Sequence, residues 1–111
     1  MSDAQFREQI DSIVALTRNM LEACREGAWE RFHDLEPRRR DEIMALFATS
    51  PQADDAEYAA SAIKSVIDLD ERIIGICEEE KRACAEQLAT IRRGRHVHDA
   101  YSGRRQGAGH P

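Results

Sequence analysis

The chain has 111 residues and a formal net charge of −5; 33% of its residues are charged and 5% are aromatic. This length predicts one small domain, and the abundance of Ala, Glu, Arg, Leu and Ile is typical of helical bundles and coiled coils. No stretch approaches the roughly 18 apolar residues of a membrane span, and the first ten residues lack the apolar region of a secretory signal, so we expect a cytoplasmic protein.

The charge is distributed unevenly along the chain. Residues 1–91 carry 11 basic and 20 acidic side chains, a net charge of −9, whereas residues 92–111 carry five arginines against Asp99, a net charge of +4. An acidic body with a basic tail is not typical of a general nucleic-acid binder. The tail can dock on the body or on an acidic partner.

Apolar residues recur at helical spacing over residues 3–25, where we predict the first helix. The stripe advances by alternating steps of four and three residues, as in a heptad repeat. Its members are apolar except for one threonine: Phe6, Ile10, Ile13, Thr17, Met20 and Cys24. Gly27 interrupts the pattern and suits the left-handed conformation that often ends a helix.

A second helix is predicted over residues 29–48. Because the connection is short, it forms an antiparallel hairpin with the first helix. Pro37 lies inside it, where proline removes a hydrogen bond and pushes against the carbonyl group of His33. Either the helix continues through Pro37 with a kink, or it restarts there with Asp34 as N-cap; we favour the continuous helix. The apolar face comprises Trp29, Phe32, Leu35, Ile43, Leu46 and Phe47.

The third helix is predicted over residues 55–93, a stretch without proline in which apolar residues keep helical spacing. Gly75 costs about 1 kcal/mol relative to Ala, which we do not expect to break the helix. The pattern fades at Gly94, so we divide the chain into a helical bundle over residues 1–93 and a basic segment over residues 94–111. In that segment we expect a short regulatory helix with Val97, Ala100 and Tyr101 and a disordered tail after residue 102.

The predicted fold is therefore all-α: an antiparallel hairpin plus one long third helix, in a three- to four-helix bundle. The third helix outruns the other two, which leaves Leu88 and Ile91 on an uncovered face, and such surface usually marks an interaction site. A second copy, the chain's own C-terminal segment or a client helix can cover it, and competition among them would make a switch. Alternatively, the third helix bends back at Gly75 and completes a four-helix bundle.

The sequence contains no glycine-rich phosphate loop, no GxSxG and no HExxH. The three cysteines are odd in number and form no CxxC pair, so we expect neither a disulfide framework nor a zinc site. His96 and His98 have no acidic residues at metal-ligand spacing. We therefore predict that the protein is not an enzyme and has no catalytic, cofactor or metal site.

Two charged residues interrupt apolar stripes. Asp70 falls in the stripe of the third helix where an apolar residue is expected, and Arg39 does so in the second helix. An unpaired buried charge is costly, which suggests that the two residues pair across the helices and fix their register. The alternative is that both are partly exposed.

Three motifs resemble the FliT family of flagellar export chaperones over about residues 10–101. The first is Leu16-Thr17 and Met20-Leu21 leading to Gly27-Ala28-Trp29, where the family has a "GDW"-like turn. The second is Leu35-Glu36 followed by arginines and the apolar run over residues 43–47. The third is Gly94-Arg95 with Ala100-Tyr101, similar to the family's "GRRAxxAY" ending. The chain departs from the family pattern at Ala28, Pro37, His96 and His98.

The resemblance implies a chaperone that binds the C-terminal helical part of the filament-cap protein FliD, prevents its premature assembly and delivers it to the type III export apparatus. Export gate or ATPase components and the regulator FlhDC are further partners that it suggests, the regulator for some members only. We place the client contact on the apolar faces of the second and third helices, at Ile67, Ile74, Leu88 and Ile91. Each of these can also be core or dimer interface.

Two other functions remain open. A homodimeric coiled-coil module would self-associate through the third helix. A modulator of flagellar transcription would act through protein contacts, or through nucleic acid with the arginine tail, in which case binding would depend steeply on salt.

Overall fold

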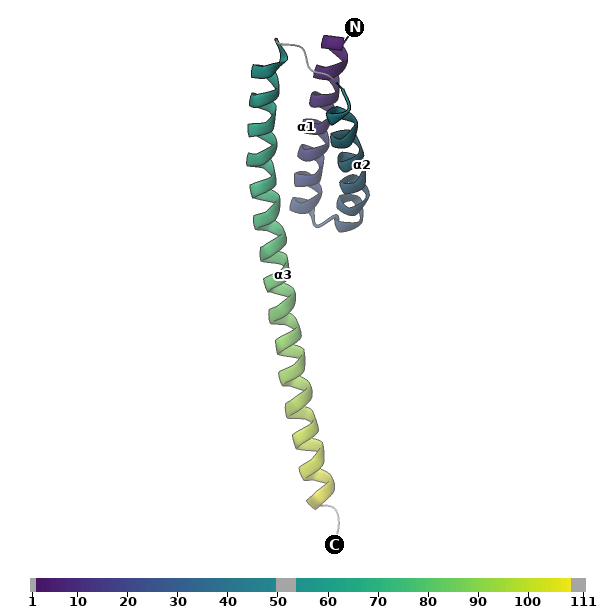
Figure 1. The fold of residues 1–111 in the computed structure, drawn as a ribbon. Helices are drawn as coiled ribbons and strands as arrows, with labels where there is room; N and C mark the ends of the chain where they lie inside the picture. The colour runs from purple at the N-terminus through teal and green to yellow at the C-terminus, as the bar shows by residue number, and fades with distance from the viewer. Residues whose placement is uncertain (1, 50–53, 109–111) are drawn as a thin grey trace. The chain divides into compact units, whose positions relative to one another are not determined.

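The computed structural model describes the backbone of residues 2–49 and 54–108 and the side chains of residues 4–49 and 54–95. These residues form three α-helices: α1 (Ser2–Glu26), α2 (Trp29–Phe47) and α3 (Asp55–Ala108) (Figure 1). The described residues contain no strand, so the all-α prediction is confirmed. The chain divides into two compact units, residues 1–77 and residues 78–111.

The predicted hairpin is confirmed, and Gly27 closes α1 as expected. Gly27 has a φ of 70°. Its N–H donates to the carbonyl oxygen of Cys24 at 3.1 Å, and the N–H of Ala28 donates to that of Ala23 at 2.8 Å. These are the two bonds of a Schellman motif, which satisfies carbonyl groups at the end of a helix. The chain then reverses, and α2 runs back along α1 (Figure 1).

α2 is continuous through Pro37, as favoured above, and the alternative with a restart at Asp34 is wrong. Proline leaves the carbonyl group of His33 without its helical partner. His33 is exposed, so water can bind this carbonyl group.

α3 differs from the prediction at its C-terminal end. It was expected to stop near residue 93 and to be followed by a separate short helix, but one helix continues to Ala108 through Gly75 and Gly94. The helix has no break at Gly75, where the alternative requires one. A single glycine costs about 1 kcal/mol in a helix, which the many Ala, Glu and Arg residues of α3, all of high helix propensity, offset. The helix includes residues 103–108, and residues 109–111 lie outside the described part; the division into a bundle over residues 1–93 and a basic segment over residues 94–111 stays a prediction.

The core of residues 1–77 comes mainly from α1, which lies between α2 and the first part of α3 (Figure 1). Half-buried side chains such as Trp29 and Ile76 pack around it. The buried cluster contains five residues of α1, two of α2 and one of α3: Leu16, Met20, Leu21, Ala23, Cys24, Phe32, Leu35 and Ile73. None of the described side chains of residues 78–95 is buried.

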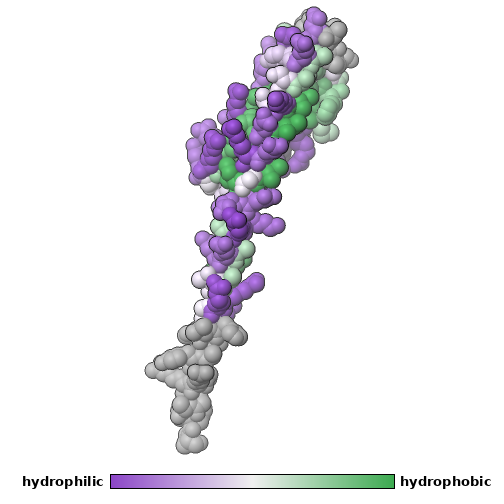
Figure 2. Space-filling view, turned by 90° about the vertical axis from the view of Figure 1, so that its left-hand side faces the viewer, coloured by the Kyte–Doolittle hydropathy of each residue, from purple (hydrophilic) through white to green (hydrophobic). Residues whose placement is uncertain are grey.

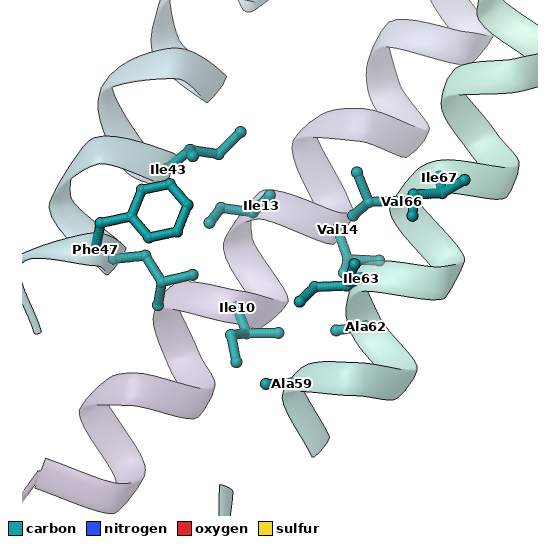
Figure 3. Close-up of a pocket in the computed structure, with 11 residues that line it drawn as sticks. Ile10, Ile13, Val14, Ile43, Phe47, Ala59, Ala62, Ile63, Val66 and Ile67 are labelled. Atoms are coloured by element: carbon teal, nitrogen blue, oxygen red, sulfur yellow. The ribbon is translucent and has the colours of Figure 1, made fainter. Parts of the chain in front are cut away.

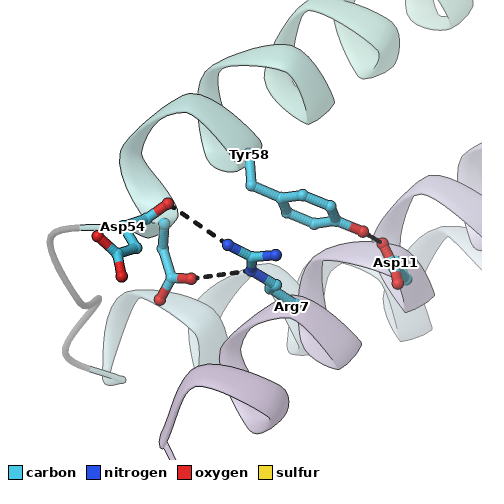
Figure 4. A network of polar contacts seen from close by, with 5 residues as sticks. Arg7, Asp11, Asp54 and Tyr58 are labelled. Carbon is cyan, nitrogen blue, oxygen red and sulfur yellow. Dashed lines mark hydrogen bonds and ion pairs between the residues drawn. The ribbon is translucent and has the colours of Figure 1, made fainter.

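A polar cluster ties the start of α3 to α1 (Figure 4). Nε of Arg7 donates to Oδ1 of Asp55 at 3.1 Å, and the side chain of Asp55 is fully buried. The guanidinium group also lies over the ring of Tyr58, 4.9 Å from its centroid, and the Tyr58 hydroxyl donates to the carboxylate of Asp11. That hydrogen bond, together with partial desolvation, raises the pKa of Tyr58 above its ordinary value. The cluster fixes where α3 begins against α1.

Candidate functional site: an apolar groove

An open apolar groove with a volume of about 180 Å³ lies in the unit of residues 1–77 (Figure 3). α1 forms its floor, and α2 and α3 form its two walls. Only aliphatic and aromatic residues line it: Ile10, Ile13, Val14, Ile43, Leu46, Phe47, Ala59, Ala62, Ile63, Val66 and Ile67.

The floor and the walls differ in burial. Ile10 and Ile13, on the floor, are buried. On the walls Phe47 is 83% exposed and Ile67 is 52% exposed, and Ile63 is exposed to a similar degree. Large apolar side chains gathered on one concave surface are unusual on a monomer and mark binding sites. Figure 2 shows apolar surface gathered over the helical bundle on the face it presents.

A layer of three polar residues, one from each helix, lies one helical turn from residues that line the groove. Nη1 of Arg39 donates to Oδ1 of Asp70 at 2.6 Å, which confirms the predicted ion pair. The same nitrogen donates to Oγ1 of Thr17 at 3.3 Å. Thr17 is fully buried, and its hydroxyl donates to the carbonyl oxygen of Ile13 at 2.8 Å. The threonine in the stripe of α1 therefore has a partner on α2.

The four predicted contact residues lie in different places. Ile67 lines the groove, whereas Ile74, which is also exposed, does not. Leu88 and Ile91 are exposed residues of the unit of residues 78–111. Their roles stay predictions. Val97, Ala100 and Tyr101 fall within α3, but their side chains lie outside the described part.

Most of the groove was missed by the sequence analysis. Ile43, Leu46 and Phe47 were assigned to the apolar face of the second helix, without distinguishing those that close the core from those left open. The sequence does contain a pattern that indicates the groove. The end of the second helix and the start of the third both carry apolar residues, and only a fourth helix could cover them all.

The described residues hold no group of three or more His, Cys, Asp or Glu side chains arranged to bind a metal ion. The cysteines are free thiols: Cys24 is buried, Cys77 half-buried and Cys84 exposed. Burial, and then the neighbouring Cys77 thiol, raise the pKa of Cys24 to about 11. Within the same residues, no helix has the length and apolarity that crossing a membrane requires.

A family model described as "Flagellar protein FliT" matches residues 7–103, which include most of α1, all of α2 and α3 up to its last residues. No curated protein and no solved structure matches the chain.

Proposed function

This chain belongs to the FliT family of flagellar proteins, and on that premise we propose that it is a cytoplasmic export chaperone for a FliD-like filament-cap protein. It binds the C-terminal helical part of the client, prevents premature assembly and delivers the client to the type III export apparatus. This is a stoichiometric binding role, without turnover. The observation that supports it is the open apolar groove between α2 and α3.

The groove has the form that an amphipathic helix fits. A helix in it would complete a four-helix bundle and place its apolar side chains, spaced at i, i+3, i+4 and i+7, over Ile10 and Ile13. Burying an Ile or Phe side chain completely contributes about 1.5–3 kcal/mol, so covering the exposed parts of Phe47 and Ile67 would contribute about 1–2 kcal/mol each. Such contacts provide a large part of a micromolar affinity, about 8 kcal/mol.

Ile67 is the predicted contact residue that this proposal places in the groove. Ile74 is proposed as a contact on the adjoining surface of α3. Leu88 and Ile91 are proposed as a separate contact of residues 78–111, for the client or for export gate or ATPase components. Binding to FlhDC is a further proposal that rests on the family resemblance alone.

Calorimetric titration with the C-terminal helical segment of FliD from the same genome tests the proposal. Phe47→Glu puts a charge into the groove, and we expect it to weaken binding about tenfold or more. Met44→Glu is the matched control, because Met44 is also an exposed apolar residue of α2 but does not line the groove. It should leave the affinity within about threefold of the wild type.

Three results are informative. Loss of binding with Phe47→Glu alone supports the groove as the client site. If both variants bind the segment with equal affinity, the chaperone function stands, but the client binds at a site other than the groove. No binding by the wild type, together with a dimer in light scattering that the segment does not dissociate, overturns the proposal in favour of a self-associating structural module.

A further inference from the structure

We propose that Arg39 and Asp70, with Thr17 holding Arg39 in place, set the register of the docked helix by hydrogen bonding to one amide side chain, an Asn or Gln, that the docked helix carries. This inference rests on the proposed function, since it concerns the occupant of the same groove. It goes beyond that function by naming a recognition element and the chemical group that it selects.

The position of the layer is the first argument. Each of its residues lies one helical turn, four residues, from a groove-lining residue of its own helix: Thr17 from Ile13, Arg39 from Ile43 and Asp70 from Val66. The layer therefore lies at the same level on all three helices. A helix that extends along the groove toward this end meets it one turn past the apolar contacts.

The change in packing across the layer is the second argument. On one side lies the buried cluster, to which α2 contributes Phe32 and Leu35 and α3 contributes Ile73. On the other side, none of the described apolar residues of α2 and α3 is buried. The three helices thus enclose a buried core on the side of Phe32 and leave an open groove on the side of Ile43. The polar layer separates the two, and it limits how far along the groove a docked helix can extend its apolar face.

The remaining hydrogen-bonding capacity is the third argument. The Arg39 side chain is 19% exposed and that of Asp70 is 34% exposed, so the pair keeps an accessible edge. Both bonds that Arg39 makes in the layer leave from Nη1, whereas a guanidinium group has five N–H donors. The bond to Asp70 ends on Oδ1, and a carboxylate has about four acceptor positions. The accessible edge therefore offers donors beside acceptors.

An amide side chain matches this edge. Its carbonyl oxygen accepts from the guanidinium group of Arg39, and its NH₂ group donates to the carboxylate of Asp70. A second carboxylate at this level would face Asp70, and a second cation would face Arg39, each an unfavourable like-charge contact. An aliphatic side chain would remove water from the pair and return no hydrogen bond, which weakens binding. One polar residue of this kind commonly fixes the register of packed helices.

A double-mutant cycle between the protein and the client segment tests the inference. Each Asn and Gln of the FliD C-terminal helical segment is replaced in turn by Leu, and each peptide is titrated into the wild type and into a double variant, Arg39→Met with Asp70→Leu. At one amide we expect the Leu substitution to weaken binding to the wild type about tenfold and to leave or improve binding to the double variant. A purely structural role for the layer would not produce this coupling at a single client position.

The double variant is expected to fold, because replacing an ion pair by apolar residues of similar size is often neutral or stabilising. Circular dichroism checks this. If the double variant fails to fold, Asp70→Leu alone replaces it, since it removes both acceptor oxygens; the preference for the amide should then fall.

The outcomes separate the two proposals. Coupling at one amide supports the recognition layer. If every amide substitution changes the affinity for the wild type and for the double variant equally, or if the segment binds without any amide, the layer does not recognise an amide. The proposed chaperone function is unaffected by either result. Failure of the unsubstituted segment to bind the wild type overturns the proposed function itself.

Discussion

The two phenylalanines of α2 differ sharply in burial, since Phe32 is 9% exposed and Phe47 is 83% exposed. Folding therefore removes most of Phe32 from water but only about one sixth of Phe47, which corresponds to roughly 0.3–0.5 kcal/mol when full burial contributes about 1.5–3 kcal/mol. We expect Phe47→Ala to change the free energy of unfolding by at most about 0.5 kcal/mol. Phe32→Ala should lower it by about 3–5 kcal/mol, because it also leaves a cavity in the core.

Urea denaturation followed by circular dichroism measures both changes, and similar slopes for the variants show that the same surface is exposed on unfolding. A decrease of more than about 1.5 kcal/mol in the free energy of unfolding of Phe47→Ala would contradict the assignment of Phe47 to an open groove. Phe47 would then belong to the core of the folded chain, and the groove would not be open surface available to a partner.

Four further perturbations test other parts of the structure. Gly27→Ala should destabilise the protein by about 1 kcal/mol because of the positive φ, whereas Gly75→Ala, in open space within α3, should stabilise it by about 0.5–1 kcal/mol; thermal denaturation distinguishes the signs. Iodoacetamide at pH 8 should label the exposed Cys84 rapidly and Cys24 only on unfolding, because the Cys24 thiol is buried and its pKa of about 11 keeps it protonated. Mass spectrometry of the labelled protein measures both rates. Asp70→Ala should lower the free energy of unfolding by about 1–2 kcal/mol by leaving its arginine partner unpaired, and the double variant without both charges should recover this loss in urea denaturation.

The hairpin could be predicted from the sequence because its signals are local. Gly27 at the end of an apolar stripe needs no tertiary information to be identified as a helix end. The ion pair between Arg39 and Asp70 was also predictable, since each charge occupies an apolar position of its own helix and a buried charge needs a partner. Thr17 was noted as an exception in its stripe, but its bond to Arg39 depends on how far α1 and α2 are shifted along each other, which periodicity does not specify.

The groove could not be predicted because apolar spacing shows which face of a helix is hydrophobic, not whether another helix covers it. Phe47 and Phe32 fall on the same predicted face of α2, yet Phe32 belongs to the buried cluster to which all three helices contribute, whereas Phe47 lines the open groove. The end of α3 was mispredicted for a different reason. The sequence between Gly94 and Ala108 carries no recognisable apolar stripe, so its helix could be predicted only from the helix propensity of single residues, which pattern analysis weighs poorly.

The central claim, that the groove holds the client helix, is tested most directly by nuclear magnetic resonance of protein labelled at its isoleucine methyl groups. The FliD segment would be titrated into the full chain, and each methyl signal followed to saturation. Isoleucines lie both in the groove, as Ile13, Ile63 and Ile67 do, and outside it, as Ile74 and Ile91 do. We predict large, saturable shifts at the groove methyl groups; shifts at Ile74 and Ile91 would report the additional contacts proposed above. Saturable binding that shifts Ile74 or Ile91 and leaves the groove signals in place would contradict the account.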